Sequence, residues 1–204
     1  WEIGLQGREL DFTSLWDRFI HEKPGHKGEV KIPEITIAVE LEKMWIDRDR
    51  FLGEVSGTFV HRGEVWQTAV LKSTMNGQHS LRVDLRPGPD GNREMRITAA
   101  DAGEALKLLD YYGEMRGGLL DLRGRYDDAQ PGRPLKGTLR VENYRIQNAP
   151  LLARVLSVMA LGGIADELSG KGLNFAELEI PFTFSEGVLK IADARATGAS
   201  LGFT

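Results

Sequence analysis

The histidines of this chain, the residues that most often indicate catalysis or metal binding, do not form a recognisable site. His21 and His26, in the segment HEKPGH, are the closest pair, and their five-residue spacing across Pro-Gly matches no common metal motif. His61 and His79 each stand alone near a predicted turn. Neither a P-loop nor a dinucleotide-binding fingerprint is present. We therefore expect no metal, no cofactor and no enzymatic activity.

The closely spaced carboxylates also have a simpler explanation than acid–base chemistry. Asp47 and Asp49 alternate with arginines in the segment DRDR, which is typical of a charged strand end. Glu177 and Glu179 are two residues apart in an alternating segment, so they fall on the same solvent-facing side of a strand. Neither pair is expected to be a catalytic dyad.

The composition favours an ordinary folded chain without a nucleic-acid partner. Of the 204 residues, 41% are hydrophobic, which is enough for a buried core. The chain carries 26 basic and 30 acidic residues, a net charge of −4, and it has no basic run that would bind nucleic acid. The absence of cysteine excludes disulfides and thiolate metal sites.

Alternation of apolar and polar residues with a period of two dominates the sequence and predicts β-strands with one dry and one wet face. This pattern is typical of antiparallel sheet. The apolar positions of the five clearest segments are Ile35, Ile37, Val39 and Leu41; Phe51, Val55 and Phe59; Leu81, Val83 and Leu85; Leu139 and Val141; and Leu178, Ile180, Phe182 and Phe184.

Tight-turn dipeptides separate these segments. Arg62-Gly63, Asn76-Gly77, Asp90-Gly91 and Glu186-Gly187 supply the positive φ angles that short hairpins need. Hairpins at this spacing predict an antiparallel meander and disfavour parallel βαβ crossovers. We expect residues 1–204 to form a single β-rich module.

Two short helices are predicted between the strands. The first covers Ser14 to Ile20. The second begins after Asp101, which forms a capping-box-like pair with Glu104, and it is expected to end at Gly113. Its predicted apolar stripe consists of Ala105, Leu106, Leu109 and Tyr112.

A third predicted helix, from Ala149 to Leu161, is almost entirely apolar. Asn148 is its expected N-cap, and Arg154 and Ser157 are its only strongly polar residues. Its 13 residues are too few to cross a bilayer, which takes about 20. Such a helix is either a buried cap on the end of the sheet or a movable gate that touches lipid. The first reading uses Leu152, Val155, Leu156 and Met159, and the second uses Leu151, Val158, Leu161 and Ile164.

The second half of the chain resembles a family of bacterial envelope proteins. The segments that carry the resemblance are AADAGEALKLLDYYGEMRGGLLDLRG, LKGTLRVENYRIQNAPLLARVLSVMALGGIADELSGKGLNFAELEIPF and ADARATGASLGFT. Their order of Gly-centred strand, Ala-Pro-led apolar helix, Gly170, Gly172 and Phe175 is similar to that of the AsmA-like family. The TamB and YhdP groups are related to this family.

The resemblance implies a fold, a location and a function. Such proteins have a long twisted antiparallel sheet folded as an open apolar groove with short apolar helices capping it. They are anchored in the inner membrane, project into the periplasm and carry phospholipid in outer-membrane biogenesis. We accordingly expect periplasmic lipid transport by a fragment of a longer protein, whose membrane anchor lies outside this sequence. The expected partners are phospholipid acyl chains, the inner membrane and envelope proteins.

Two alternatives remain open on sequence alone. One-sided strands also build closed sandwiches, so the dry faces are either an ordinary core or an open groove. The chain could also be a structural or protein-interaction scaffold for envelope assembly, acting through its sheet edges without a ligand. In the groove reading, the candidate lipid-contact residues are Leu151, Leu152, Val155, Leu156, Val158, Met159, Leu161, Ile164, Leu178, Ile180, Phe182 and Phe184.

Overall fold

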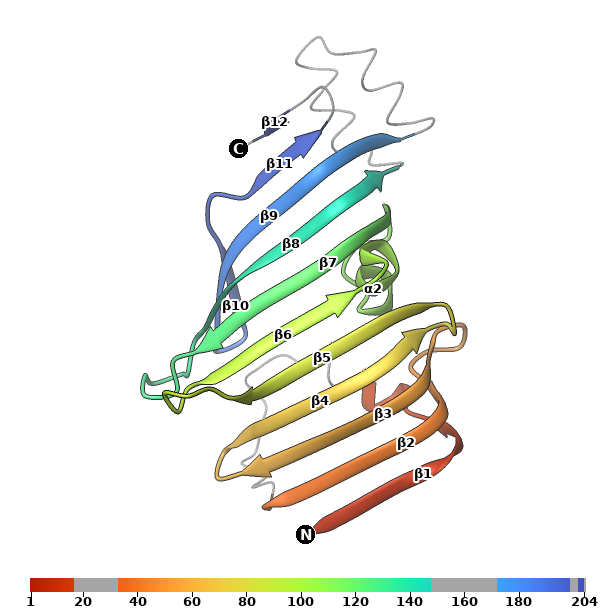
Figure 1. The fold of residues 1–204 in the computed structure, drawn as a ribbon, viewed down its shortest axis with the longest axis vertical. Coiled ribbons are helices and arrows are strands. Elements are labelled where there is room, and N and C mark those ends of the chain that lie inside the picture. Colours follow the sequence, from red (N-terminus) through yellow and green to blue (C-terminus); the bar gives the residue numbers. More distant parts are fainter. Residues whose placement is uncertain (17–32, 148–171, 199–201, 204) are drawn as a thin grey trace.

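The chain forms a mainly β structure built around one long sheet (Figure 1). The computed structural model describes residues 1–16, 33–147, 172–198 and 202–203. Within these residues the sheet has twelve strands. They are β1 (Glu2–Asp11), β2 (Ile35–Trp45), β3 (Phe51–Arg62), β4 (Val65–Met75), β5 (His79–Pro87), β6 (Arg93–Ala99), β7 (Met115–Tyr126), β8 (Leu135–Ile146), β9 (Leu173–Ser185), β10 (Val188–Ile191), β11 (Arg195–Gly198) and β12 (Gly202–Phe203).

From β1 to β9, strand order in space follows strand order in the chain. From β2 to β9 every neighbouring pair is antiparallel, which confirms the predicted meander. At the Asn76-Gly77 and Glu186-Gly187 turns both residues have positive φ angles, as tight hairpins require. Strands β10 and β11 both pair with β9, and β11 continues to β12. The described path is open, with β1 and β12 at opposite ends of the sheet (Figure 1).

The expected antiparallel pairing does not hold at the first strand pair. Strand β1 runs parallel to β2, with Leu5 opposite Val39 and Leu10 opposite Met44. Parallel neighbours need a connection of about a dozen residues or more. The chain between the two strands, residues 12–34, is long enough to return to the starting side. The sheet is therefore mixed.

The predicted helix after Asp101 is present as α2 (Ala102–Leu108). Asp101 is its N-cap, because its side chain accepts a hydrogen bond of 2.8 Å from the backbone N–H of Glu104. The predicted end at Gly113 is wrong, since the C-cap is Leu109 and Tyr112 lies beyond the helix. The helix is shorter because its buried face is made by Ala102, Ala105 and Leu108 instead of the longer predicted stripe.

The best-packed core lies at one end of the strands, next to α2. Leu52, Met75 and Val141 are almost completely buried there. The rings of Tyr144 and Phe175 stack with their centroids 5.1 Å apart. Gly103 brings α2 against β7, because a Cβ at this position would lie 2.4 Å from the carbonyl oxygen of Met115. This core stabilises the sheet. It covers only part of the apolar face.

The two remaining helix predictions fall largely or wholly outside the described residues. Residues 14–16 of the predicted Ser14–Ile20 helix are helical, and the rest lie outside. The predicted Ala149–Leu161 helix lies entirely outside. In the part of the chain that the structure describes, no helix is long and apolar enough to cross a membrane.

Candidate functional site

One face of the sheet carries an unbroken line of apolar positions across nine strands. Pairing places these residues directly opposite one another from β1 to β9. We call this line the apolar row: Leu5, Val39, Gly57, Leu71, Val83, Ile97, Leu122, Leu139 and Ile180. At about 4.8 Å between strands, the row is about 38 Å long.

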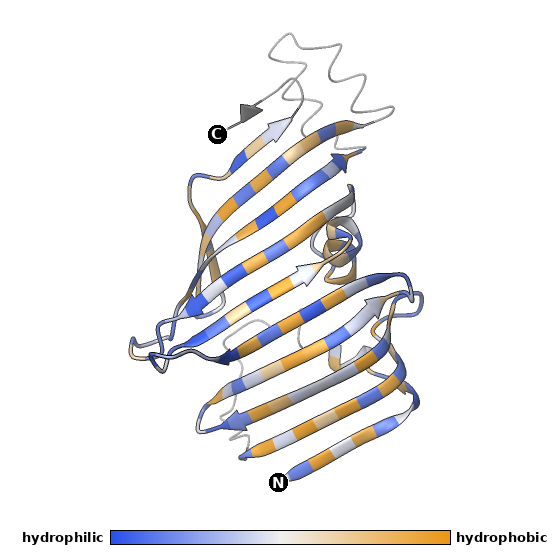
Figure 2. Ribbon diagram, in the orientation of Figure 1, coloured by the Kyte–Doolittle hydropathy of each residue, from blue (hydrophilic) through white to orange (hydrophobic). Residues whose placement is uncertain are grey.

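A second line on the same face is equally continuous and runs next to the apolar row. It crosses ten strands and ends on β10. This flanking row consists of Ile3, Ile37, Phe59, Ala69, Leu85, Met95, Gly124, Gly137, Phe182 and Ile191. Figure 2 shows the resulting alternation of hydrophobic and hydrophilic residues along the strands. The dry side of the sheet is thus a band several residues wide.

The opposite face is polar over the same length. Its register line is Gln6, Glu40, Ser56, Lys72, Arg82, Thr98, Asp121, Arg140, Glu179 and Arg195. Arg140 forms ion pairs of 2.9 Å with both Glu177 and Glu179, so these carboxylates are paired on a surface. Away from this face, in the turn between β2 and β3 next to α2, Arg50 pairs with Asp47. The sheet therefore separates a hydrocarbon-like side from a charged side.

Burial differs along the strands of the dry face. Near α2, Leu81, Ala99, Leu120 and Val141 are buried, as a protein core requires. In the apolar row, by contrast, Val83, Ile97, Leu122 and Leu139 are only half-buried. At the ends of the band, Leu5, Phe184, Leu189 and Ile191 are exposed. Burial on this face is therefore uneven: Leu85 and Leu135, which lie farther from α2, are also buried, whereas Phe184, Leu189 and Ile191 at the margin are exposed.

The predicted lipid-contact residues of β9 all lie on the dry face. Leu178 packs at the edge of the core, Ile180 ends the apolar row, and Phe182 belongs to the flanking row. Phe184 is 42% exposed. The other eight predicted residues, Leu151, Leu152, Val155, Leu156, Val158, Met159, Leu161 and Ile164, lie outside the described residues.

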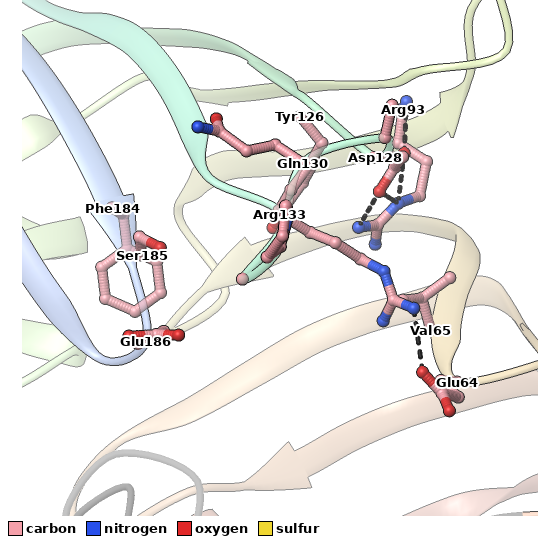
Figure 3. Close-up of a pocket in the computed structure, with 13 residues that line it drawn as sticks. Glu64, Val65, Arg93, Tyr126, Asp128, Gln130, Arg133, Phe184, Ser185 and Glu186 are labelled. Carbon is pink, nitrogen blue, oxygen red and sulfur yellow. Dashed lines mark hydrogen bonds and ion pairs between the residues drawn. The ribbon is translucent and has the colours of Figure 1, made fainter.

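A cavity of about 620 Å³ opens at the ends of the strands away from α2 (Figure 3). It lies between the β3–β4 turn, the β7–β8 loop and the β9–β10 hairpin. Val65, Tyr126 and Phe184 contribute apolar surface, whereas Glu64, Arg133 and Glu186 contribute charge. The cavity therefore joins the dry face to a polar rim.

Arg93 fixes one wall of this cavity. Its guanidinium donates hydrogen bonds of 2.7–3.1 Å to Asp128 and a bond of 3.0 Å to the carbonyl of Trp66. The same group lies 4.0 Å from the ring centre of Tyr126. These hydrogen bonds hold the pKa of Asp128 below its ordinary value of 3.8. Burial raises the pKa of Tyr126.

The other arginine of the cavity is held much more loosely. Arg133 extends from the β7–β8 loop toward the β3–β4 turn (Figure 3) and donates a 2.9 Å hydrogen bond to Glu64. The Glu64 side chain is 81% exposed. Glu186 lies near the same loop, because a Cβ on Gly132 would be 3.2 Å from its carboxylate. Arg133 can change partners at small cost, since exposed ion pairs contribute little.

The polar part of this cavity has no local signature in the sequence. Arg93 and Asp128 are 35 residues apart, and Arg133 and Glu64 are 69 apart, so no local motif joins them. The one local signal is Pro131-Gly132-Arg133-Pro134, a turn sequence that does not specify the partners of Arg133. Pairing of β6 with β7 brings the first two residues together.

One serine pattern near the end of the chain resembles a motif of hydrolytic enzymes. Residues 198–202 read Gly-Ala-Ser-Leu-Gly, the spacing of a hydrolase nucleophile elbow. That elbow requires a strand followed by a helix. Here β11 and β12 flank the pattern as antiparallel partners, with Thr197 opposite Gly202. Both described flanks of the pattern are therefore strands, whereas the elbow needs a strand followed by a helix.

Comparison with family models, with curated proteins and with solved structures finds no match for this chain. The two faces of the sheet and the cavity at its edge are the features that bear on function.

Proposed function

We propose that this chain is a non-enzymatic lipid-transfer module that holds phospholipid acyl chains on the dry face of its sheet. The observation that carries the proposal is the apolar row, which continues across nine strands and keeps half-buried side chains at its centre. A chain that needed only a core would gain most by closing the sheet or covering this band completely.

The energetics of such a face suit transfer more than storage. Each acyl CH₂ gains about 0.8 kcal/mol on leaving water, so a 16-carbon chain gains roughly 12 kcal/mol. The hydrocarbon of a bilayer offers the same gain. Movement from bilayer to protein is then nearly neutral, and the apolar band removes the barrier of crossing water. No catalytic group is needed for this step.

The dimensions also support the proposal. The hydrocarbon core of a bilayer is about 30 Å thick, so one leaflet holds acyl chains about 15 Å long. The apolar row, at about 38 Å, is longer than one such chain. A lipid could therefore shift along the row while its chains stay on apolar surface. This geometry fits a path better than it fits one closed pocket.

The setting of this activity follows from the resemblance to the AsmA-like family. On that basis the module forms an open groove with short helices at its ends. It works in the periplasm as part of a protein anchored in the inner membrane, and it contributes to outer-membrane biogenesis. The groove, the anchor and the location are parts of the proposal.

Photo-crosslinking tests the proposal directly. A photoreactive amino acid is placed at Ile180 or Phe182, on the dry face of β9. Matched controls carry it at Glu179 or Thr183, the flanking positions on the other face. After incubation with vesicles containing a tagged phospholipid, we expect the tag on the Ile180 and Phe182 variants only. Equal labelling of both faces, or no labelling of either, would contradict the proposal.

A scaffold for envelope assembly is the second candidate, and one observation favours it. Strand β1 is ten residues long and is exposed along almost all of its length. Among the described strands it pairs with β2 alone. An open edge of this length can accept another strand from a partner protein. A purified protein that carries no phospholipid and takes none from vesicles would favour this function.

A further inference from the structure

The cavity beside Phe184 has the composition of a site for an amphiphile. Its apolar wall is continuous with the dry face, because Phe184 pairs with Leu135 on one side and Leu189 on the other. Leu189 is 55% exposed. Arg133 and Glu64 lie across the cavity from Phe184, and Glu186 lies beside Phe184 on the same hairpin (Figure 3). A molecule bound here would contact hydrocarbon surface and ionic groups at the same time.

The charges that line the cavity favour a zwitterionic group over a purely anionic one. Arg93 and Asp128 neutralise each other through their hydrogen bonds. The remaining charged groups that line the cavity are Glu64, Arg133 and Glu186, which together carry one net negative charge. A group with only negative charge is repelled by this balance. A zwitterion can place its phosphate at Arg133 and its cation near a glutamate.

We infer that this cavity binds the phosphoethanolamine headgroup of a glycerophospholipid whose acyl chains lie on the adjoining dry face. Arg133 contacts the phosphate, in exchange for its exposed bond to Glu64. Glu186 accepts hydrogen bonds from the primary ammonium, a compact cation with three donors. Phe184 and Leu189 contact the start of the acyl chains. The inference rests on the proposed function and adds headgroup selection to it.

Competition between lipids measures this selection. The protein is incubated with vesicles that contain equal amounts of phosphatidylethanolamine and phosphatidylglycerol, and the lipids it carries away are quantified by mass spectrometry. We expect a roughly two- to fivefold preference for phosphatidylethanolamine, the size expected of one partly exposed charge interaction. Equal recovery of both lipids would overturn the inference and leave the proposed function intact. Failure to recover any lipid would overturn both.

Isosteric variants assign the preference to the cavity. Glu186→Gln removes the excess negative charge, and we expect the preference to fall toward parity while total lipid binding persists. Glu142→Gln is the matched control, because Glu142 is exposed on β8, away from the cavity. A Glu186→Gln variant that keeps the full preference would overturn the inference. Arg133→Gln is expected to reduce the recovery of both lipids.

The phosphoethanolamine group could come from a membrane lipid or from a soluble compound. Soluble glycerophosphoethanolamine, which carries the same headgroup without acyl chains, distinguishes the two. We expect it to compete poorly with the lipid, because the dry face contributes most of the binding free energy. Saturable binding of the soluble compound with equal affinity would overturn the assignment to a lipid.

Discussion

Arg93 and Asp128 join the start of β6 to the β7–β8 loop through a buried two-pronged ion pair. Two guanidinium nitrogens of Arg93 contact the carboxylate, and the backbone N–H of Arg93 donates a further bond of 3.0 Å to it. The Arg93 side chain is only 6% exposed. The loop that forms one side of the cavity is thereby tied to the sheet.

Truncation of this pair is expected to be costly. Arg93→Ala leaves Asp128 partly buried without its partner, and loss of one member of a buried pair typically costs about 3–5 kcal/mol. The measurement is the free energy of unfolding from urea titration. Arg96→Ala is the control, because Arg96 makes an exposed pair with Asp121 and should lose about 1 kcal/mol or less. Similar losses of unfolding free energy in the two variants would show that the Arg93 pair stabilises the fold no more than an exposed ion pair does.

The same pair predicts how stability depends on acid. Hydrogen bonds from Arg93 lower the pKa of Asp128 in the folded chain below 3.8, its ordinary value. The ionised form is therefore favoured by folding, and its contribution is present above about pH 4 and is lost as the pH falls through the folded pKa. We expect Asp128→Asn to be less stable than the parent at pH 7, with a smaller difference at pH 3. A constant difference across this range would contradict the assignment.

The apolar end near α2 is expected to behave as a core and not as a ligand surface. Leu52 is 1% exposed there, so Leu52→Ala should cost about 2–5 kcal/mol. Leu119→Ala is the matched control, because Leu119 is 54% exposed and its truncation should change stability by about 0.5 kcal/mol or less. Thermal and urea unfolding measure both. A tolerated Leu52→Ala would mean that this end of the sheet is loosely packed.

Gly103 makes a separate prediction about how α2 sits on the sheet. An added methyl group would lie 2.4 Å from the carbonyl oxygen of Met115, so Gly103→Ala must move α2 away from β7. We expect a loss of about 1–3 kcal/mol despite the better helix propensity of alanine. Gly113→Ala meets nothing within 4 Å and should be close to neutral. A stabilising Gly103→Ala would show that the contact relaxes easily.

The strands and turns were predictable because their signals are local. Alternation identified β2, β5, β8 and β9, and the cap of α2 followed from Asp101 and Glu104. The parallel pairing of β1 was not predictable, because a long connection can return to either side of the sheet. The end of α2 was also not predictable from Gly113, because the helix ends at Leu108 with Leu109 as its C-cap.

The candidate site was predictable on its apolar side only. Leu178, Ile180, Phe182 and Phe184 share a face because side chains alternate along any strand. Their continuation into the apolar row depends on register, which pairs Ile180 with Leu139 and Leu139 with Leu122. No segment of the sequence encodes that register by itself. The contacts of Arg93 and Arg133 depend on the same long-range pairing.

Phe184 allows lipid contact to be separated from folding. Because it is 42% exposed, Phe184→Asp should cost only about 1–2 kcal/mol, less than the loss of a fully buried aromatic side chain. We nevertheless expect it to reduce binding of a fluorescent fatty acid strongly, since a carboxylate next to the acyl chains must be desolvated. Val188→Asp is the matched control. Val188 is on the same hairpin and 55% exposed, and it pairs with Ser185 on the other face. A folded Phe184→Asp variant that binds the fatty acid as well as Val188→Asp does would exclude Phe184 as a lipid contact.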